Sequence, residues 1–283
     1  MSGVRMAVFD LDGTLLEHGA LTKEAVGMLR ALRKNGVQVV IATGRHRGTV
    51  PLRLQSPRLV DYMICSNGAV LTEPRKKPLL EATLSARELR SLLELGREFG
   101  CRYAVSVGRV TYLSRREPLQ RRKADGGSDT KKYFWRYCMY PLHSRLVKSW
   151  DAFLRRPDAR AEKVVCTTAD PKQELIFRAL AEKSGPFTAT GSGQAAEITA
   201  AGVSKGSALG LLTARLNIPK EAVAAFGNDD NDLSLRPYAG RFVAAKNATA
   251  AALEAADEVA DSIPAAALRL CVSSERKEAN RPW

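Results

Sequence analysis

The stretch Ala7-Val8-Phe9-Asp10-Leu11-Asp12-Gly13-Thr14-Leu15-Leu16 decides the expected fold. The apolar run from Met6 to Phe9 predicts a buried strand that ends in two carboxylates spaced i, i+2. Alternation along a strand places Asp10 and Asp12 on one side. In open α/β sheets, ligands bind at the carboxyl ends of the strands. The pair therefore predicts a site for a metal ion or a phosphoryl group, and the alternative is a turn with two solvated aspartates.

Composition sets broad limits. The chain has 283 residues, of which 45% are hydrophobic and 26% charged, as in a globular protein of one large or two modest domains. No apolar run approaches the ~20 residues that cross a bilayer, and the N-terminus lacks a signal-peptide pattern. Five cysteines are scattered singly, which predicts reduced thiols and no zinc site. We therefore expect a cytoplasmic protein.

The formal charge of +14 is concentrated in the middle of the chain. Residues 75–187 contain 25 Lys and Arg against 13 Asp and Glu, a net of +12, whereas the remainder contains 19 against 17, a net of +2. Such a block attracts anions, among them phosphorylated metabolites, nucleic acid or an anionic surface. The alternative is that these charges serve solubility alone.

A second strand follows the first by way of a helix. Helical spacing covers about 21–34, and the β-branched run 37–42 predicts a strand buried on both faces, which completes a βαβ unit. This strand ends in Thr43-Gly44-Arg45. Thr43 is suited to donate to a phosphate oxygen, and Gly44 allows close approach of the backbone. The same three residues also suit an ordinary turn.

The pattern of predicted strands and helices changes after residue 76, and the first pattern returns near residue 187. Residues 77–187 predict a separate α/β domain, and its segment 115–140 is basic and aromatic. We expect residues 1–76 and 188–283 to form the core, with short strands near 187–190 and 195–198 belonging to it. The predicted fold class is α/β, with a Rossmann-like core around a parallel sheet and an inserted α/β cap domain.

The last core segments add polar groups at strand and helix ends. Lys205 lies in the first turn of a helix over about 204–216, where the helix dipole disfavours a cation, so an anion is expected nearby. The apolar strand 222–226 runs into Gly227-Asn228-Asp229-Asp230-Asn231-Asp232. Oxygen ligands of this kind suit Mg²⁺, and Asp and Asn also favour the start of a helix. Both interpretations are compatible.

The ordered series F-D-L-D-G-T-L-L, I-A-T-G-R, G-V-S-K-G and F-G-N-D-D-N-D resembles the four motifs of haloacid dehalogenase-like (HAD) phosphatases. The S-N-G-A and K-N-A segments and the place of the insert resemble the Cof-type branch. The resemblance implies that Asp10 is the nucleophile that forms an aspartyl phosphate, with Asp12 as general acid and base. It also implies Mg²⁺ held by Asp10, by the backbone oxygen of Asp12 and by the fourth motif.

The resemblance assigns roles to further residues. The phosphoryl oxygens would be bound by Leu11, Thr43, Gly44, Lys205 and Asn231. Asp232, together with Asp229, would lie behind these ligands, and Asp232 would orient waters or Lys205. The sequence departs from the common G-D-x-x-N-D pattern because Asn228 stands where relatives have aspartate. Asn228 is the expected third metal ligand, and Asp229 is the alternative.

These residues predict a Mg²⁺-dependent phosphatase of small phosphorylated metabolites, sugar phosphates first among them, working through an aspartyl phosphate. The alternatives are a phosphomannomutase-like phosphomutase and a catalytically idle protein that binds anions or RNA through residues 115–140. The expected partner is a small phosphorylated substrate, with neither a membrane nor nucleic acid. The sequence does not indicate the oligomeric state.

Overall fold

A computed structural model describes residues 3–17, 19–114, 143–192 and 195–272 of the chain. The chain forms two compact units. The first comprises Met1–Gly44, Val50–Leu80 and Ser204–Trp283, and the second comprises Arg45–Thr49 and Glu81–Val203. The predicted basic and aromatic segment 115–140 lies outside the described residues.

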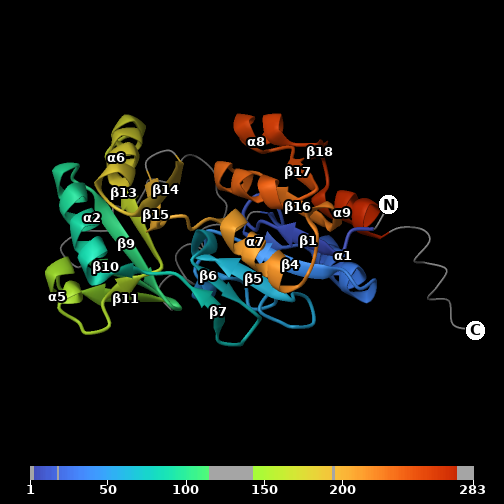
Figure 1. The fold of residues 1–283 in the computed structure, drawn as a ribbon, viewed down its shortest axis with the longest axis horizontal. Helices are drawn as coiled ribbons and strands as arrows, with labels where there is room; N and C mark the ends of the chain where they lie inside the picture. The colour runs from blue at the N-terminus through green and yellow to red at the C-terminus, as the bar shows by residue number, and fades with distance from the viewer. Residues whose placement is uncertain (1–2, 18, 115–142, 193–194, 273–283) are drawn as a thin grey trace, which may run out of the picture. The chain divides into compact units, whose positions relative to one another are not determined.

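The first unit is built on an eight-stranded sheet with the order β18-β17-β16-β1-β4-β5-β6-β7 (Figure 1). Its strands are β1 (Met6–Phe9), β4 (Gln38–Ala42), β5 (Tyr62–Cys65), β6 (Val70–Thr72), β7 (Pro78–Glu81), β16 (Val223–Gly227), β17 (Arg241–Ala245) and β18 (Glu258–Ala260). Pairing from β18 through β5 is parallel, and β6 pairs antiparallel with β5. The structure thus shows the predicted Rossmann-like arrangement, with β1 at its centre.

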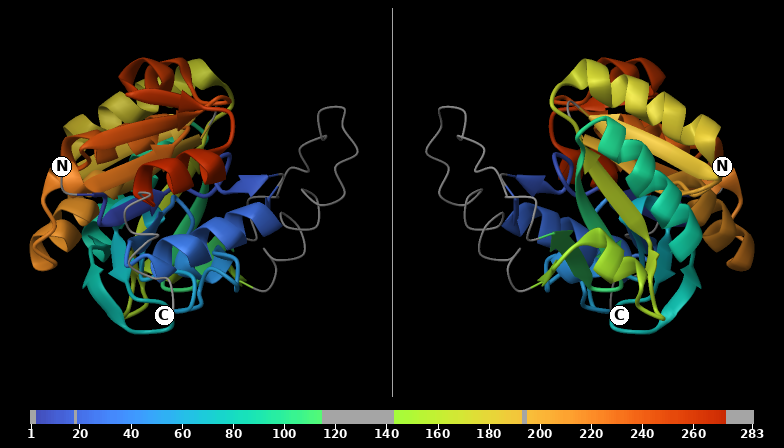
Figure 2. Two further views of the ribbon diagram at one scale, coloured as in Figure 1. Left: turned by 90° about the vertical axis from the view of Figure 1, so that its right-hand side faces the viewer. Right: turned by 90° about the vertical axis from the view of Figure 1, so that its left-hand side faces the viewer.

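Helices cover both faces of this sheet. Alternate residues of β1 enter different cores: Ala7 and Phe9 pack in the cluster with α1 (Lys23–Lys34) and α9 (Ile263–Cys271), which lie side by side (Figures 1 and 2). Met6 and Val8 pack in the cluster with α7 (Lys205–Arg215) and η5 (Asp230–Tyr238). Burial on both faces explains why β1 and β4 read as continuous apolar runs. The remaining elements of this unit are β2 (Leu16–Glu17), β3 (Ala20–Leu21), η2 (Ser66–Gly68), η4 (Lys220–Ala222) and α8 (Ala250–Ala255).

The second unit has a six-stranded sheet with the order β11-β10-β9-β13-β15-β14. Its elements are η1 (Arg47–Thr49), β8 (Leu84–Ser85), α2 (Ala86–Glu98), β9 (Arg102–Val107), β10 (Val110–Ser114), β11 (Ser144–Val147), α5 (Trp150–Leu154), β12 (Arg160–Ala161), β13 (Lys163–Thr167), α6 (Pro171–Ser184), β14 (Phe187–Ser192) and β15 (Ala195–Ala200). Tyr103, Val105, Val164 and Ile198 from the strands share one core with the three helices. Helices therefore cover one face of this sheet.

The predicted boundary at residue 187 is wrong. Strands β14 and β15 pair with each other and β15 pairs with β13, so both belong to the second sheet. The chain returns to the first unit only at Ser204, and it leaves that unit after Leu80. The physical reason is that β15 continues the antiparallel ladder of β13, from Val164 opposite Ile198 to Thr167 opposite Ala195.

The described residues contain no helix that is both long and apolar enough to span a membrane.

Candidate active site

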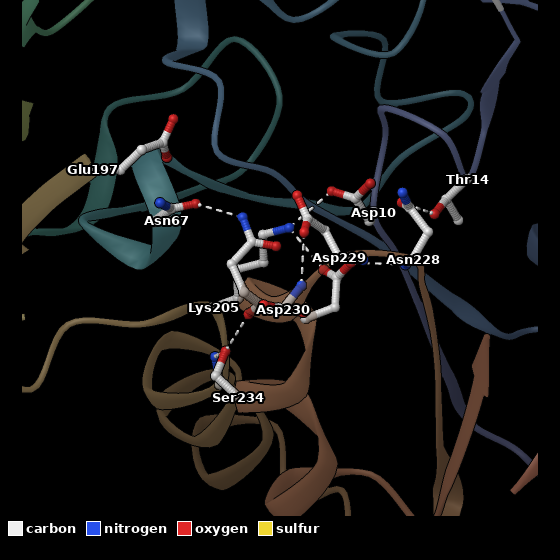
Figure 3. A network of polar contacts seen from close by, with 12 residues as sticks. Asp10, Thr14, Asn67, Glu197, Lys205, Asn228, Asp229, Asp230 and Ser234 are labelled. Carbon is white, nitrogen blue, oxygen red and sulfur yellow. Dashed lines mark hydrogen bonds and ion pairs between the residues drawn. The ribbon is translucent and has the colours of Figure 1, made fainter. Parts of the chain in front are cut away.

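A buried ion-pair network lies where β1 ends (Figure 3). The Lys205 Nζ donates to Asp10 Oδ1 at 2.8 Å and to Asp232 Oδ1 at 2.7 Å. The side chains of these residues are 1%, 7% and 0% exposed, so all three groups are removed from water. Lys205 begins α7 and Asp232 lies in η5, so the network joins three elements that are distant in sequence.

Burial governs the protonation of this network. It raises the pKa of Asp10 to about 7, opposed by the ion pair with Lys205 and reinforced by Asp232. Burial also disfavours the charged form of Lys205, but Asp10 and Asp232 outweigh it and raise the pKa of the lysine above its ordinary value. Lys205 is therefore a permanent cation. Asp10 needs further positive charge nearby to be fully ionised at neutral pH.

Three oxygen-bearing groups converge beside Asp10. One terminal atom of the Asn228 amide lies 2.8 Å from Thr14 Oγ1, 2.9 Å from the Asp12 carbonyl oxygen and 3.2 Å from Asp10 Oδ2. The Asn228 amide has two possible orientations. With its nitrogen in this position it donates to Asp10 Oδ2 and the Asp12 carbonyl oxygen, whereas with its oxygen there three oxygens face one another. Figure 3 shows Asn228 between Thr14 and Asp10.

This spacing fits a magnesium ion. Adjacent ligands of an octahedral Mg²⁺ with bonds of about 2.1 Å lie ~3.0 Å apart. The separations of 2.9 Å and 3.2 Å from the Asn228 atom to Asp12 O and Asp10 Oδ2 match that edge. Within the described ranges, no three or more His, Cys, Asp or Glu side chains are grouped so as to hold a metal. The fitting set instead combines one carboxylate, one backbone carbonyl and one amide.

Gly13 makes this approach possible. Its φ of +88° is a left-handed conformation that favours glycine, and a Cβ there would lie 2.6 Å from Asn228 Nδ2. The D-x-D-G turn therefore brings the backbone of the first motif against the fourth. The side chain of Asp12 is exposed, so it lies at the water-accessible side of the site.

The residues after Asn228 build the start of η5. Asp229 Oδ1 accepts from the Asp230 N–H at 2.8 Å, and Asp232 Oδ2 accepts from the N–H groups of Asn228 at 2.9 Å and Asp229 at 3.0 Å. Asp229 therefore caps the helix, as Asp and Asn at this place favour, whereas Asn228 faces Asp10 and Asp12. This geometry favours Asn228 over Asp229 as the candidate ligand.

The candidate phosphate-binding residues lie on the same unit. Thr43 is 1% exposed and its N–H donates to the Ile64 carbonyl at 2.8 Å, which fixes it at the end of β4. The side chain of Leu11 is fully buried, so only its backbone is suited to contact a phosphate. Gly44 follows Thr43 directly and is partly exposed. Asn231 donates from Nδ2 to Asn67 Oδ1 at 3.2 Å, and its own buried Oδ1 has no partner among the described residues.

Asn67 is a site residue that the sequence reasoning did not assign. It is 3% exposed, has a φ of 55°, and its N–H donates to the Thr43 carbonyl at 3.2 Å. It thereby links the second motif to Asn231 of the fourth. A signal was present, because Asn67-Gly68 lies one residue after a buried apolar run and such pairs favour left-handed backbone.

Comparison with known proteins identifies the family. The family model described as haloacid dehalogenase-like hydrolase matches residues 7–268. The chain belongs to this family. Among curated relatives of this HAD-like chain, phosphatase YwpJ of Bacillus subtilis is 26% identical over 273 residues, covering 87% of the chain and 90% of the relative. The HMP-PP phosphatase of Cronobacter sakazakii is 27% identical over 247 residues, covering 86% and 85%.

A solved structure confirms the HAD fold. The haloacid dehalogenase-like hydrolase from B. subtilis superposes with a TM-score of 0.82 at 23% identity, covering 94% of this chain and 99% of that one. The HAD-like match includes the segments that contain Asp10, Thr43, Lys205 and Asn228.

Proposed function

We propose that this HAD-like protein is a Mg²⁺-dependent phosphatase of small phosphorylated metabolites, sugar phosphates among them, that works through an aspartyl phosphate on Asp10. The observation that carries the proposal is the environment of Asp10. Its Oδ1 is held by buried Lys205, and its Oδ2 faces the Asn228 amide together with the Asp12 carbonyl. One carboxylate is thus placed between a fixed ammonium and a group of oxygens that fits a divalent cation.

The proposed Mg²⁺ ligands are Asp10 Oδ2, the backbone oxygen of Asp12 and the side-chain oxygen of Asn228. When bound, the ion supplies positive charge that neutralises the phosphoryl oxygens during transfer. The raised pKa of Asp10 supports this assignment, because burial leaves the carboxylate short of positive charge. A divalent cation at this place favours the ionised form that a nucleophile requires.

Each step of the proposed reaction is assigned to a residue of the chain. Asp10 Oδ1 attacks phosphorus and displaces the alcohol, whose oxygen takes the proton of the Asp12 carboxyl group. Asp12 next accepts a proton from water, which attacks phosphorus, releases phosphate and regenerates the Asp10 carboxylate. Lys205 offsets the negative charge throughout, and Asp232 fixes its direction through the contact of 2.7 Å.

The relatives support the substrate class. Two curated relatives that match most of the chain are named phosphatases, and one of them is named for HMP-PP. Charge supports it as well, since a chain with a net charge of +14 attracts anionic substrates. The intact buried network of Lys205, Asp10 and Asp232 supports an enzyme over an idle binding protein, because such a network is costly unless it serves a purpose.

The test is release of inorganic phosphate from a panel of phosphorylated metabolites, measured with Mg²⁺ and again with a chelator. The proposal predicts release that depends on Mg²⁺ and is abolished in Asp10→Asn, because an amide does not form the acyl phosphate. Circular dichroism and melting of Asp10→Asn check that the fold is retained. Phosphate release by a cleanly purified Asp10→Asn protein would contradict the proposed nucleophile. Conversion of hexose phosphates to their isomers without phosphate release would favour a mutase.

A further inference from the structure

A buried histidine in the second unit has a hydrogen-bond donor that no described residue accepts. His46 lies in the short segment Arg45–Thr49 and is 5% exposed. Its Nδ1 accepts from the Gly48 N–H at 3.1 Å, so the ring proton of the neutral imidazole is on Nε2. Burial lowers the pKa of His46 to about 3, with neighbouring cationic groups adding to the effect, so the ring is neutral at physiological pH.

The Nε2–H group is buried and has no hydrogen-bond partner among the described residues. Native proteins rarely leave a buried donor without an acceptor. The backbone around the ring is fixed, because the His46 carbonyl accepts from both the N–H and the Oγ1 of Thr49. A Cβ on Gly48 would lie 2.3 Å from the Arg109 carbonyl oxygen and 2.9 Å from His143 Nδ1. Close packing therefore holds the ring in place.

Cationic groups surround this donor. His143, Lys163, Arg109 and Arg45 all act on the imidazole in the direction that disfavours a proton. Lys163 is nearly buried, with 7% of its side chain exposed, and its Nζ lies 2.8 Å from Glu197 Oε2. The other nearby acid, Glu162, accepts from the Gly108 N–H at 2.8 Å. Among the described residues, the groups that act most on the imidazole, Lys163, Arg109 and Arg45 with them, all disfavour a proton on it, which favours an anionic acceptor over a neutral one.

We propose that His46 Nε2–H, with Lys163, Arg109 and Arg45 supplying positive charge, forms a binding site in the second unit for an oxyanion, a phosphate or carboxylate group. The proposed site belongs to the second unit, whereas Asp10 belongs to the first, and its existence does not depend on the proposed phosphatase activity. The oxyanion accepts the hydrogen bond from Nε2–H and remains charged. Two sources share this chemistry: a second anionic group of a substrate, and a free oxyanion acting as a ligand on its own.

Nitrogen NMR of the full chain tests the site directly. The protein has only three histidines, so ¹⁵N-histidine spectra of the wild type, His18→Gln and His143→Gln assign the His46 ring by elimination. We expect His46 in the Nε2–H tautomer, with an Nε2 resonance that shifts saturably as inorganic phosphate or malonate is added. Sodium chloride at the same ionic strength should not reproduce the shift. The absence of a saturable shift with either oxyanion would overturn the proposal.

A matched pair of variants tests the charges. Lys163→Gln should weaken oxyanion binding on the order of tenfold, as expected when a charged partner is lost. Lys172→Gln removes an exposed lysine from the same unit and should leave the binding constant unchanged. Equal effects of the two substitutions would show that general charge attracts the anions and would overturn the site. Melting curves of both variants establish that Lys163→Gln is folded.

Kinetics then distinguish the two sources. If a substrate supplies the oxyanion, Lys163→Gln should raise KM about tenfold for 3-phosphoglycerate relative to glycerol 3-phosphate, which lacks the carboxylate. If a free oxyanion is the ligand, sulfate should change the kinetics of a simple aryl phosphate at the concentration that saturates the His46 shift. Absence of any phosphatase activity would contradict the proposed function, whereas the NMR titration would still decide the site.

Discussion

Asn228 sets the charge of the proposed cation site. Close attraction between a carboxylate and a cation is strong in a partly dehydrated cleft. Asn228→Asp should therefore lower the Mg²⁺ concentration for half-maximal activity by on the order of tenfold, or ~1.4 kcal/mol, and Asn228→Ala should raise it. Activity titrated against Mg²⁺ measures both. Asp229→Ala is the control, because Asp229 Oδ1 caps the Asp230 N–H, and loss of Mg²⁺ dependence in that variant alone would contradict the assignment.

His46 should make stability sensitive to acid. Its pKa is about 3 in the folded chain against an ordinary 6.5, so between these values the unfolded state binds a proton that the folded state does not. Stability is then lost as pH falls below 6.5, by about 2 kcal/mol between pH 7 and pH 5 from this residue. His46→Gln should lose correspondingly less over that range in urea unfolding. Identical pH slopes for the two proteins would contradict the neutral buried ring.

The sequence predicts most residues of the candidate site, but it does not predict every contact that joins them. The motif order predicts that Asp10, Lys205 and Asp232 meet, and the structure brings them within hydrogen-bond distance. The Asn67-Gly68 pair indicates a left-handed turn, but its contact with Asn231, 164 residues away, has no local signal in the sequence. Spacing alone leaves Asn228 and Asp229 as alternatives for the third ligand. The hydrogen bond from the Asp230 N–H to Asp229 Oδ1 favours Asn228 as the proposed ligand.

At the scale of elements, contact between α7 and η5 positions Lys205 against Asp232. A Cβ on Gly206 would lie 1.7 Å from the Ser234 carbonyl oxygen, a fixed backbone atom. Gly206→Ala should therefore destabilise the chain by ~1–3 kcal/mol and reduce activity as the helix shifts. Gly27→Ala is the matched control, because Gly27 lies on the exposed side of α1 and a Cβ there would have no atom within 4 Å. This substitution should stabilise the chain by roughly 0.5–1 kcal/mol. Urea unfolding of both variants measures the contrast.

Equal stability of the two alanine variants would contradict the close packing of α7 on η5.

The elements themselves are largely predictable from the sequence, as β1, β4 and β16 are apolar runs of the expected length. Strands β14 and β15 were predicted as strands but assigned to the wrong sheet. Their short, small-residue sequences show where a strand occurs, whereas the choice of partner depends on β13, distant along the chain.

At the scale of the whole molecule, the charge of +12 in residues 75–187 should affect substrate binding. Charge reversal at several of Arg115, Arg116, Arg121, Arg122 and Lys123 should raise KM for anionic substrates and reduce its dependence on salt. Activity on small aryl phosphates should change little. Steady-state kinetics at several salt concentrations provide the measurement, with reversal of exposed Lys34 and Lys220 in the first unit as control. Unchanged kinetics on every substrate would show that the charges serve solubility.

The central claim, that Asp10 carries the phosphoryl group during turnover, is tested most directly by trapping. Asp12→Asn should block activation of water, while an aryl phosphate with a good leaving group still phosphorylates Asp10 without acid assistance. After acid quench and digestion, mass spectrometry should find one added phosphoryl group on the peptide that contains Asp10, and none in Asp10→Asn. Wild-type turnover of the same substrate with no phosphorylated peptide in Asp12→Asn, or with the group on another residue, would contradict the account.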